Sequence, residues 1–136
     1  MSERTQRTRL DITPEQVRAI ITRDDPKALV EHAEKIGQAL SGSLSKSQIR
    51  GIFGAVRRIQ LKWRGDEQKA TCYRQLLMLK PKLRYQAARH APVRPLADVL
   101  EWAIDAVGDN RDNFLRFADF FEAILAYHRE RGEGGR

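Results

Sequence analysis

The sequence predicts an all-α protein that folds as a compact bundle of five to seven helices. Three observations predict this class: helix-capping signals recur along the chain, apolar residues repeat about every 3.6 positions, and no segment alternates apolar and polar residues as a β-strand does. The 136 residues are enough for one domain with a single core. We therefore expect one helical domain at residues 11–131, a flexible basic tail at 1–10 and a frayed C-terminus at 132–136.

The first two helices both begin after a residue that can cap them. Thr13 is followed by a proline and, at the third helical position, by Gln16, which is the pattern of a capping box. Asp25, also followed by proline, begins a second helix that ends at Gly42, because glycine readily adopts the conformation that terminates helices. The apolar stripe of this second helix consists of Leu29, Ala33, Ile36 and Leu40.

A third helix is expected from Ser45 to Trp63, since Ser45 and Gln48 repeat the capping-box pattern. Gly51 and Gly54 lie off its apolar face, and each costs roughly 0.5–1 kcal/mol relative to alanine in a helix interior. Their small size permits close approach by a sugar-phosphate chain or by another helix. The apolar face, which belongs in the core, consists of Ile49, Ile52, Phe53, Val56, Ile59 and Trp63.

Four further helices complete the predicted bundle. A fourth helix at 67–79 should stop at Lys80, because the next residue is a proline that would clash with the preceding turn. A short helix at 81–90 and a longer one at 95–107 follow. The last helix, at 110–131, is apolar around much of its circumference, which indicates a central position in the bundle.

Two aromatic residues of the last helix fall on a side away from its main apolar face. They are Phe120 and Tyr127. A large apolar side chain outside the core stripe is a candidate for a contact with another protein. Both residues are therefore predicted to lie at a subunit interface.

The charge of the chain is concentrated in its middle. The net charge is +7, made up of 0 in residues 1–40, +11 in residues 41–94 and −4 in residues 95–136. A segment this basic predicts a polyanionic partner, with nucleic acid as the first candidate. The acidic surface of another protein, or of another copy of this chain, is the alternative.

Rows of cations flank the apolar face of the third helix. Successive members are roughly 6–10 Å apart along the axis at about 1.5 Å per residue, which is on the scale of phosphate spacing in a nucleic-acid strand. Arginine suits such a contact because its planar fork binds two phosphate oxygens at once. An ordinary solvated basic face is the alternative. One flank carries Lys46, Arg50, Arg57 and Arg64, and the opposite flank carries Arg58 and Lys62.

A second basic cluster lies in the short helix at 81–90. Lys82, Tyr85 and Arg89 share one face of this helix, and Lys80 precedes it. An aromatic ring between cations is typical of a nucleic-acid surface, because the ring can stack on a base. In the alternative interpretation, Tyr85 packs at the edge of the core and the cations are simply solvated.

No catalytic, metal or cofactor motif is present in the sequence, so we expect neither an enzyme nor a cofactor. The three histidines are far apart with no metal-binding spacing, and Cys72 cannot form an intrachain disulfide, since it is the single cysteine. Cys72 is interpreted as a small apolar helix residue, with a reactive thiol as the alternative. The absence of a secretory signal and of a long apolar run predicts a cytoplasmic protein that does not enter the membrane.

Three stretches resemble one known family. "LSKSQIRGIFGAVRRI", "LLMLKPKLRYQAAR" and "AYHRERGEGG", within residues 40–132, are similar to the small helical Csm subunit of type III-A CRISPR effector complexes. The first 40 residues are less similar. The resemblance implies a non-catalytic protein of antiviral defence whose copies stack as a filament beside other subunits of a ribonucleoprotein complex, and which holds guide RNA and target RNA. By motif position, it implies RNA contacts for Arg50, Lys80, Lys82, Tyr85 and Arg89.

Two other functions remain open from the residues alone. One is a DNA-binding regulator of the helix-turn-helix type, although the cations lie along the sides of the third helix instead of at its N-terminal end. The other is a protein adaptor in which the basic middle meets acidic surfaces. Sequence-specific binding of duplex DNA would indicate the first, and self-association that ignores charge reversal would indicate the second.

Overall fold

The computed structural model describes residues 10–128, and these residues form an all-α bundle, as predicted. Two short 3-10 turns, Asp66–Gln68 and Ala91–Val93, connect the longer helices. The α-helices of the described residues are α2 (Pro14–Thr22), α3 (Pro26–Leu40), α4 (Lys46–Lys62), α5 (Lys69–Leu77), α6 (Leu79–Arg89), α7 (Arg94–Val107) and α8 (Arg111–Tyr127).

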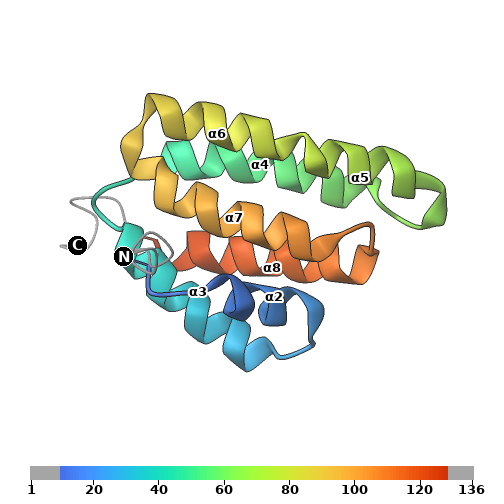
Figure 1. Ribbon diagram of the computed structural model, residues 1–136, viewed down its shortest axis with the longest axis horizontal. Coiled ribbons are helices and arrows are strands. Elements are labelled where there is room, and N and C mark those ends of the chain that lie inside the picture. The colour runs from blue at the N-terminus through green and yellow to red at the C-terminus, as the bar shows by residue number, and fades with distance from the viewer. Residues whose placement is uncertain (1–9, 129–136) are drawn as a thin grey trace.

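The helices are arranged around α8, which lies in the middle of the bundle (Figure 1). It packs against α2, α3, α4 and α7. Helices α5 and α6 follow one another along the outer edge of the molecule, and α6 rests on α7 (Figure 1). Helix α4 runs beside α5 and α6 but forms its main contacts with α8. The three helices from the basic middle of the sequence, α4, α5 and α6, therefore lie at one side of the bundle (Figure 1).

The predicted capping residues begin their helices. The Thr13 hydroxyl accepts a hydrogen bond from the Gln16 amide at 3.1 Å, and the Ser45 hydroxyl accepts one from the Gln48 amide at the same distance. The side-chain oxygen of each glutamine accepts a hydrogen bond from the backbone N–H of the capping residue, which completes each capping box. Local sequence thus fixes where α2 and α4 start.

The boundary between α5 and α6 differs from the prediction. The fourth helix was expected to stop at Lys80, but α5 ends at Leu77 and α6 begins at Leu79. Pro81 therefore lies in the first turn of α6, where a missing N–H removes no intrahelical hydrogen bond. The boundary between the two helices therefore lies about one turn before Pro81 and not directly before it.

The ends of the domain also differ slightly from the expected bounds. Leu10, assigned to the tail, is buried in the core. Helix α8 ends at Tyr127, and His128 is its C-cap residue. The His128 ring nitrogen Nε2 donates a hydrogen bond to the Leu44 carbonyl at 2.6 Å. Residues 1–9 and 129–136, which include most of the predicted tail and the frayed C-terminus, lie outside the described residues.

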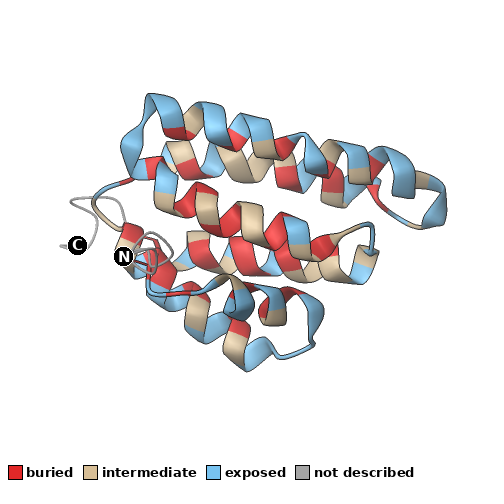
Figure 2. Ribbon diagram, viewed as in Figure 1, coloured by how far each residue is buried: buried red, intermediate tan, exposed pale blue. Residues whose placement is uncertain are grey.

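Aromatic side chains of α8 connect the helices of the core. The Phe114 ring lies 5.4 Å from that of Trp63 and 5.9 Å from that of Phe117, and the Phe121 ring lies 5.1 Å from that of Phe53. Figure 2 shows that buried residues line α7 and α8, whereas α5 and α6 are exposed on their outer sides. Cys72 lies in α5, and its side chain is fully buried among the apolar residues of the core.

The prediction of Phe120 as an interface residue is wrong. Its side chain has no exposed surface, because α8 is surrounded by four other helices and nearly its whole circumference is covered. Periodicity identifies one core face of a helix but not how many neighbours cover it. Tyr127 is half-buried, with its Cβ close to Gly37 of α3.

Candidate nucleic-acid interface

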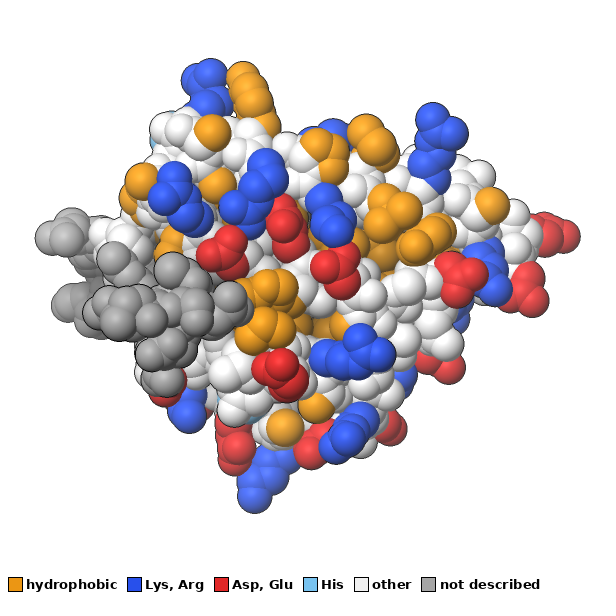
Figure 3. All heavy atoms as spheres, viewed as in Figure 1, with side chains coloured by type: hydrophobic (Ala, Val, Ile, Leu, Met, Phe, Trp, Pro, Cys, Tyr) orange, Lys and Arg blue, Asp and Glu red, His pale blue; other side chains and the backbone are white. Residues whose placement is uncertain are grey.

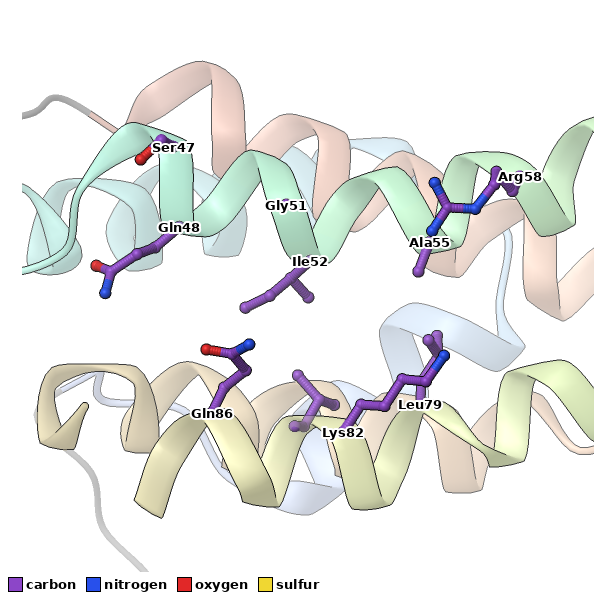
Figure 4. Close-up of a pocket in the computed structure, with 10 residues that line it drawn as sticks. Ser47, Gln48, Gly51, Ile52, Ala55, Arg58, Leu79, Lys82 and Gln86 are labelled. Carbon is purple, nitrogen blue, oxygen red and sulfur yellow. The ribbon is translucent and has the colours of Figure 1, made fainter. Parts of the chain in front are cut away.

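A groove separates α4 from α6, and we call it the α4–α6 groove. One part has a volume of about 420 Å³ and is lined by both helices (Figure 4). The side chains of Gln48 and Gln86 extend into one end of the groove from the two helices, and Arg58 and Lys82 lie farther along (Figure 4). The apolar side chains that line this part are Ile52, Ala55, Leu79 and Leu83.

The groove continues toward α5. A second hollow of about 360 Å³ shares Ala55, Arg58, Leu79 and Lys82 with the first. It adds the apolar Ile59 and Met78 together with more positive charge. No carboxylate is among the residues that line either part. The cations of the whole groove are Arg58, Lys62, Arg74 and Lys82.

The local sequence places these cations on facing helices. Arg58 and Lys62 are one turn apart on α4, on the flank of its apolar face that turns toward α6. Lys82 approaches from α6, three residues after the buried Leu79. Within residues 10–128, none of these three cations forms an ion pair with a carboxylate, so their charges face the groove without neutralisation.

The other predicted row of cations on α4 lies outside this groove. Arg50, Arg57 and Arg64 are exposed but do not line it. The Arg57 guanidinium lies 5.9 Å from the centre of the Phe53 ring and donates to Gln60 at 3.5 Å. Lys46 is half-buried. The structure thus divides the predicted α4 cations between two faces.

Lys80 is turned toward α7 instead of toward the groove. Its ammonium group lies 2.6 Å from the Asp105 carboxylate, and this hydrogen bond raises the pKa of Lys80. Arg84 likewise donates to Asp98 at 2.7 Å and to Glu101. Figure 3 shows basic and acidic side chains side by side over α6 and α7. These pairs hold α6 on α7, and they engage Lys80 within the molecule.

Tyr85 and Arg89 form a pair on the outer side of α6. The Arg89 guanidinium lies 5.5 Å from the centre of the Tyr85 ring and donates to its hydroxyl at 3.2 Å. The Tyr85 side chain is 61% exposed, which leaves one face of a ring available at the surface. The structure therefore separates Lys82, in the groove, from Tyr85 and Arg89.

Sequence reasoning missed three groove residues. Arg74 precedes Lys82 by eight residues, a spacing that places both on one side of two nearly continuous helices, so a signal existed. Gln48 and Gln86 gave no sequence signal for a place in the groove, since a glutamine on a helix has no pattern that is distinctive of a binding site. The groove itself could not be foreseen, because its width depends on the separation of α4 and α6.

Residues 10–128 contain neither a membrane-spanning helix nor a cluster of metal ligands. No helix there is long and apolar enough to cross a membrane. In the same residues, no group of three or more His, Cys, Asp or Glu side chains is placed to hold a metal ion.

Comparison with protein families shows to which family the chain is related. The family model described as Csm2 Type III-A matches residues 23–133. The chain belongs to the Csm2 family. The match covers α3 to α8, including every residue of the α4–α6 groove, and extends further toward the N-terminus than the resemblance seen in residues 40–132. No curated protein and no solved structure matched. A Csm2 protein is a small subunit of a type III-A CRISPR complex.

Proposed function

We propose that this Csm2 chain is a non-catalytic RNA-binding subunit that holds guide RNA and target RNA through their backbones during antiviral defence. The observation that carries the proposal is the α4–α6 groove, in which four cations face solvent and no carboxylate competes for them. Membership of the Csm2 family supports RNA as the polyanion.

Backbone contact suits a protein that works with a guide. Phosphate contacts supply affinity and position but carry no sequence information. Base pairing between guide and target reads the sequence, so the protein needs only to recognise charge and shape. Arg58, Lys62, Arg74 and Lys82 have the chemistry for this role, and Arg50, Arg57, Arg64 and Arg89 are proposed as further contacts.

We also propose that copies of the chain stack and contact other subunits of the complex. Asp98, Glu101 and Asp105 are already paired with α6. Asp112, Asp119 and Glu122 of α8, however, are exposed and form no ion pair within residues 10–128, which favours contact between these carboxylates and the unpaired cations of the next copy. Half-buried Tyr127, at the end of α8, is a candidate for such a contact.

Charge reversal in the groove tests RNA binding. The variant is Arg58→Glu with Lys82→Glu, and the measurement is the RNA retained by the assembled complex, purified through this chain, as salt is raised from 0.05 to 0.5 M. We expect the RNA to dissociate at lower salt, with the slope of log affinity against log salt reduced by about 2, or about one for each lost phosphate contact. Arg50→Glu with Arg57→Glu tests the other face of α4 in the same way.

The matched control is Arg18→Glu with Lys27→Glu, which makes the same charge change on exposed positions of α2 and α3. We expect it to retain RNA like the wild type. RNA retention by the groove variant that equals that of this control would contradict the proposal. Preferential binding of duplex DNA by the wild type would instead support a DNA-binding regulator.

A further inference from the structure

The α4–α6 groove contains more than a phosphate chain requires. Phosphates need cations, but the same part of the groove is also lined by the apolar side chains of Ile52 and Ala55 on α4 and of Leu79 and Leu83 on α6. Gln48 and Gln86 are half-buried, and their side chains extend into one end of the groove from the two helices (Figure 4). Apolar walls with a few convergent polar groups are typical of a site for a small organic group.

We propose that this groove binds one unstacked RNA base, with the phosphates beside it held by Arg58 and Lys82. The inference rests on the proposed function, because it assumes RNA on this face, and it adds a base-binding site to backbone binding. A volume of about 420 Å³ is within the range of ligand sites, about 300–1,000 Å³.

The side chains around the groove match the chemistry of a base. The Gln48 side-chain oxygen accepts a hydrogen bond from the Ser45 N–H, so Gln48 offers its NH2 group as a donor, whereas the Gln86 amide offers donors and an acceptor; together they can meet acceptor and donor groups on the edge of a base. The faces of a base ring are weakly hydrated and fit against Ile52 and Leu83. Binding would therefore depend on the presence of a base without depending on which base is present.

Gly51 leaves the space that the base needs. It lines the groove on α4, and a Cβ built on it would meet no atom within 4 Å. Any larger side chain at this position would extend into the groove without a clash in the protein. The cost of a glycine in the middle of α4 is thus explained by close approach of a ligand.

An acidic amphipathic helix of another protein is the competing occupant. It would fill the apolar lining with its own side chains and pair its carboxylates with the cations. The polar end of the groove favours the base, since an apolar helix face would cover the Gln86 amide and the Gln48 NH2 group without offering them a hydrogen-bond partner, which is unfavourable.

The experiment compares two labelled single-stranded oligonucleotides by fluorescence anisotropy on the full chain at 0.05 M salt. One is a twelve-nucleotide oligouridine RNA, and the other is a strand of the same length whose sugars carry no bases. Both have the same phosphates, so a difference in affinity measures the bases alone. We expect the wild type to bind the RNA about tenfold more tightly, which is within the range of base-binding contributions in single-strand proteins.

The groove-filling variant is Gly51→Leu, and Ala88→Leu is its control, because Ala88 is exposed on α6 outside the groove. We expect Gly51→Leu to bind both strands with the affinity that the wild type shows for the baseless strand. Ala88→Leu should keep the tenfold preference. Circular dichroism and thermal unfolding establish that both variants are folded.

Three results would overturn the inference: equal binding of the two strands by the wild type, a preference that persists in Gly51→Leu, or no binding of either strand by the wild type. In the first two, loss of binding in Arg58→Glu with Lys82→Glu would leave the backbone function standing. Displacement of both strands by an acidic helical peptide, with no dependence on bases, would assign the groove to a protein partner.

Discussion

At the scale of single residues, Gly37 and Gly51 differ in the space that a larger side chain would find around them. A Cβ on Gly37 of α3 would lie 2.7 Å from the Ile124 carbonyl oxygen and 2.8 Å from the Tyr127 Cβ. Both obstacles belong to the backbone region of α8, which cannot move without shifting the helix. Gly51, by contrast, is surrounded by open space. The first glycine is thus required for helix packing and the second is not.

We expect Gly37→Ala to lower the free energy of unfolding by about 1–3 kcal/mol, since overpacking outweighs the gain in helix propensity. The matched variant Gly51→Ala should raise it by about 0.5–1 kcal/mol. Urea denaturation of both variants and the wild type measures these changes. Equal effects of the two substitutions would show that α3 and α8 do not approach closely at Gly37.

His32 makes the stability depend on pH. Burial lowers the pKa of His32, and Lys35 lowers it further, against the opposing charges of Glu31 and Asp11. When the pH falls below about 6.5, the ordinary pKa of histidine, His32 of the unfolded chain therefore binds a proton, whereas His32 of the folded chain binds one only at lower pH. Stability from this residue is complete above that pH and is lost as the pH falls.

We expect the free energy of unfolding to fall more between pH 7.5 and pH 5.5 in the wild type than in His32→Gln, which has no proton to bind at this position. Urea denaturation at the two pH values gives the comparison. His90→Gln is the control, because His90 is exposed. A loss of stability in His32→Gln as large as that of the wild type would refute this role.

At the scale of elements, ion pairs attach α6 to α7. Arg84 contacts both Asp98 and Glu101, and Lys80 contacts Asp105. The Arg84 and Lys80 side chains are 45% and 35% exposed, so solvent and salt weaken these contacts. The pairs therefore contribute more to the orientation of α6 beside the groove than to overall stability.

We expect Arg84→Ala to lower the free energy of unfolding by about 1 kcal/mol or less at 0.05 M salt, as exposed ion pairs do, with the difference shrinking at 1 M salt. Arg94→Ala, at an exposed position outside these pairs, is the control. Thermal and urea unfolding at the two salt concentrations provide the measurement. A loss of several kcal/mol, unaffected by salt, would mean that Arg84 is part of the core.

Across the whole molecule, the basic middle of the sequence does not become one continuous face. Lys80 and Arg84 are paired with carboxylates of α7. The α4–α6 groove is surrounded by Arg58, Lys62, Arg74 and Lys82. Arg50 and Arg57 lie on another side of α4. The high positive charge of residues 41–94 predicts a polyanionic partner. Only the folded arrangement distinguishes the cations that remain unpaired from those that hold helices together.

The sequence by itself determined the fold class, the capped starts of α2, α3 and α4, and most of the apolar positions that are buried. These features depend on residues within a few positions of one another, so local patterns encode them. The tertiary structure decided the groove, the pairing of Lys80 and the burial of Phe120. Each of these depends on which distant helices become neighbours, and local periodicity carries no information on that choice.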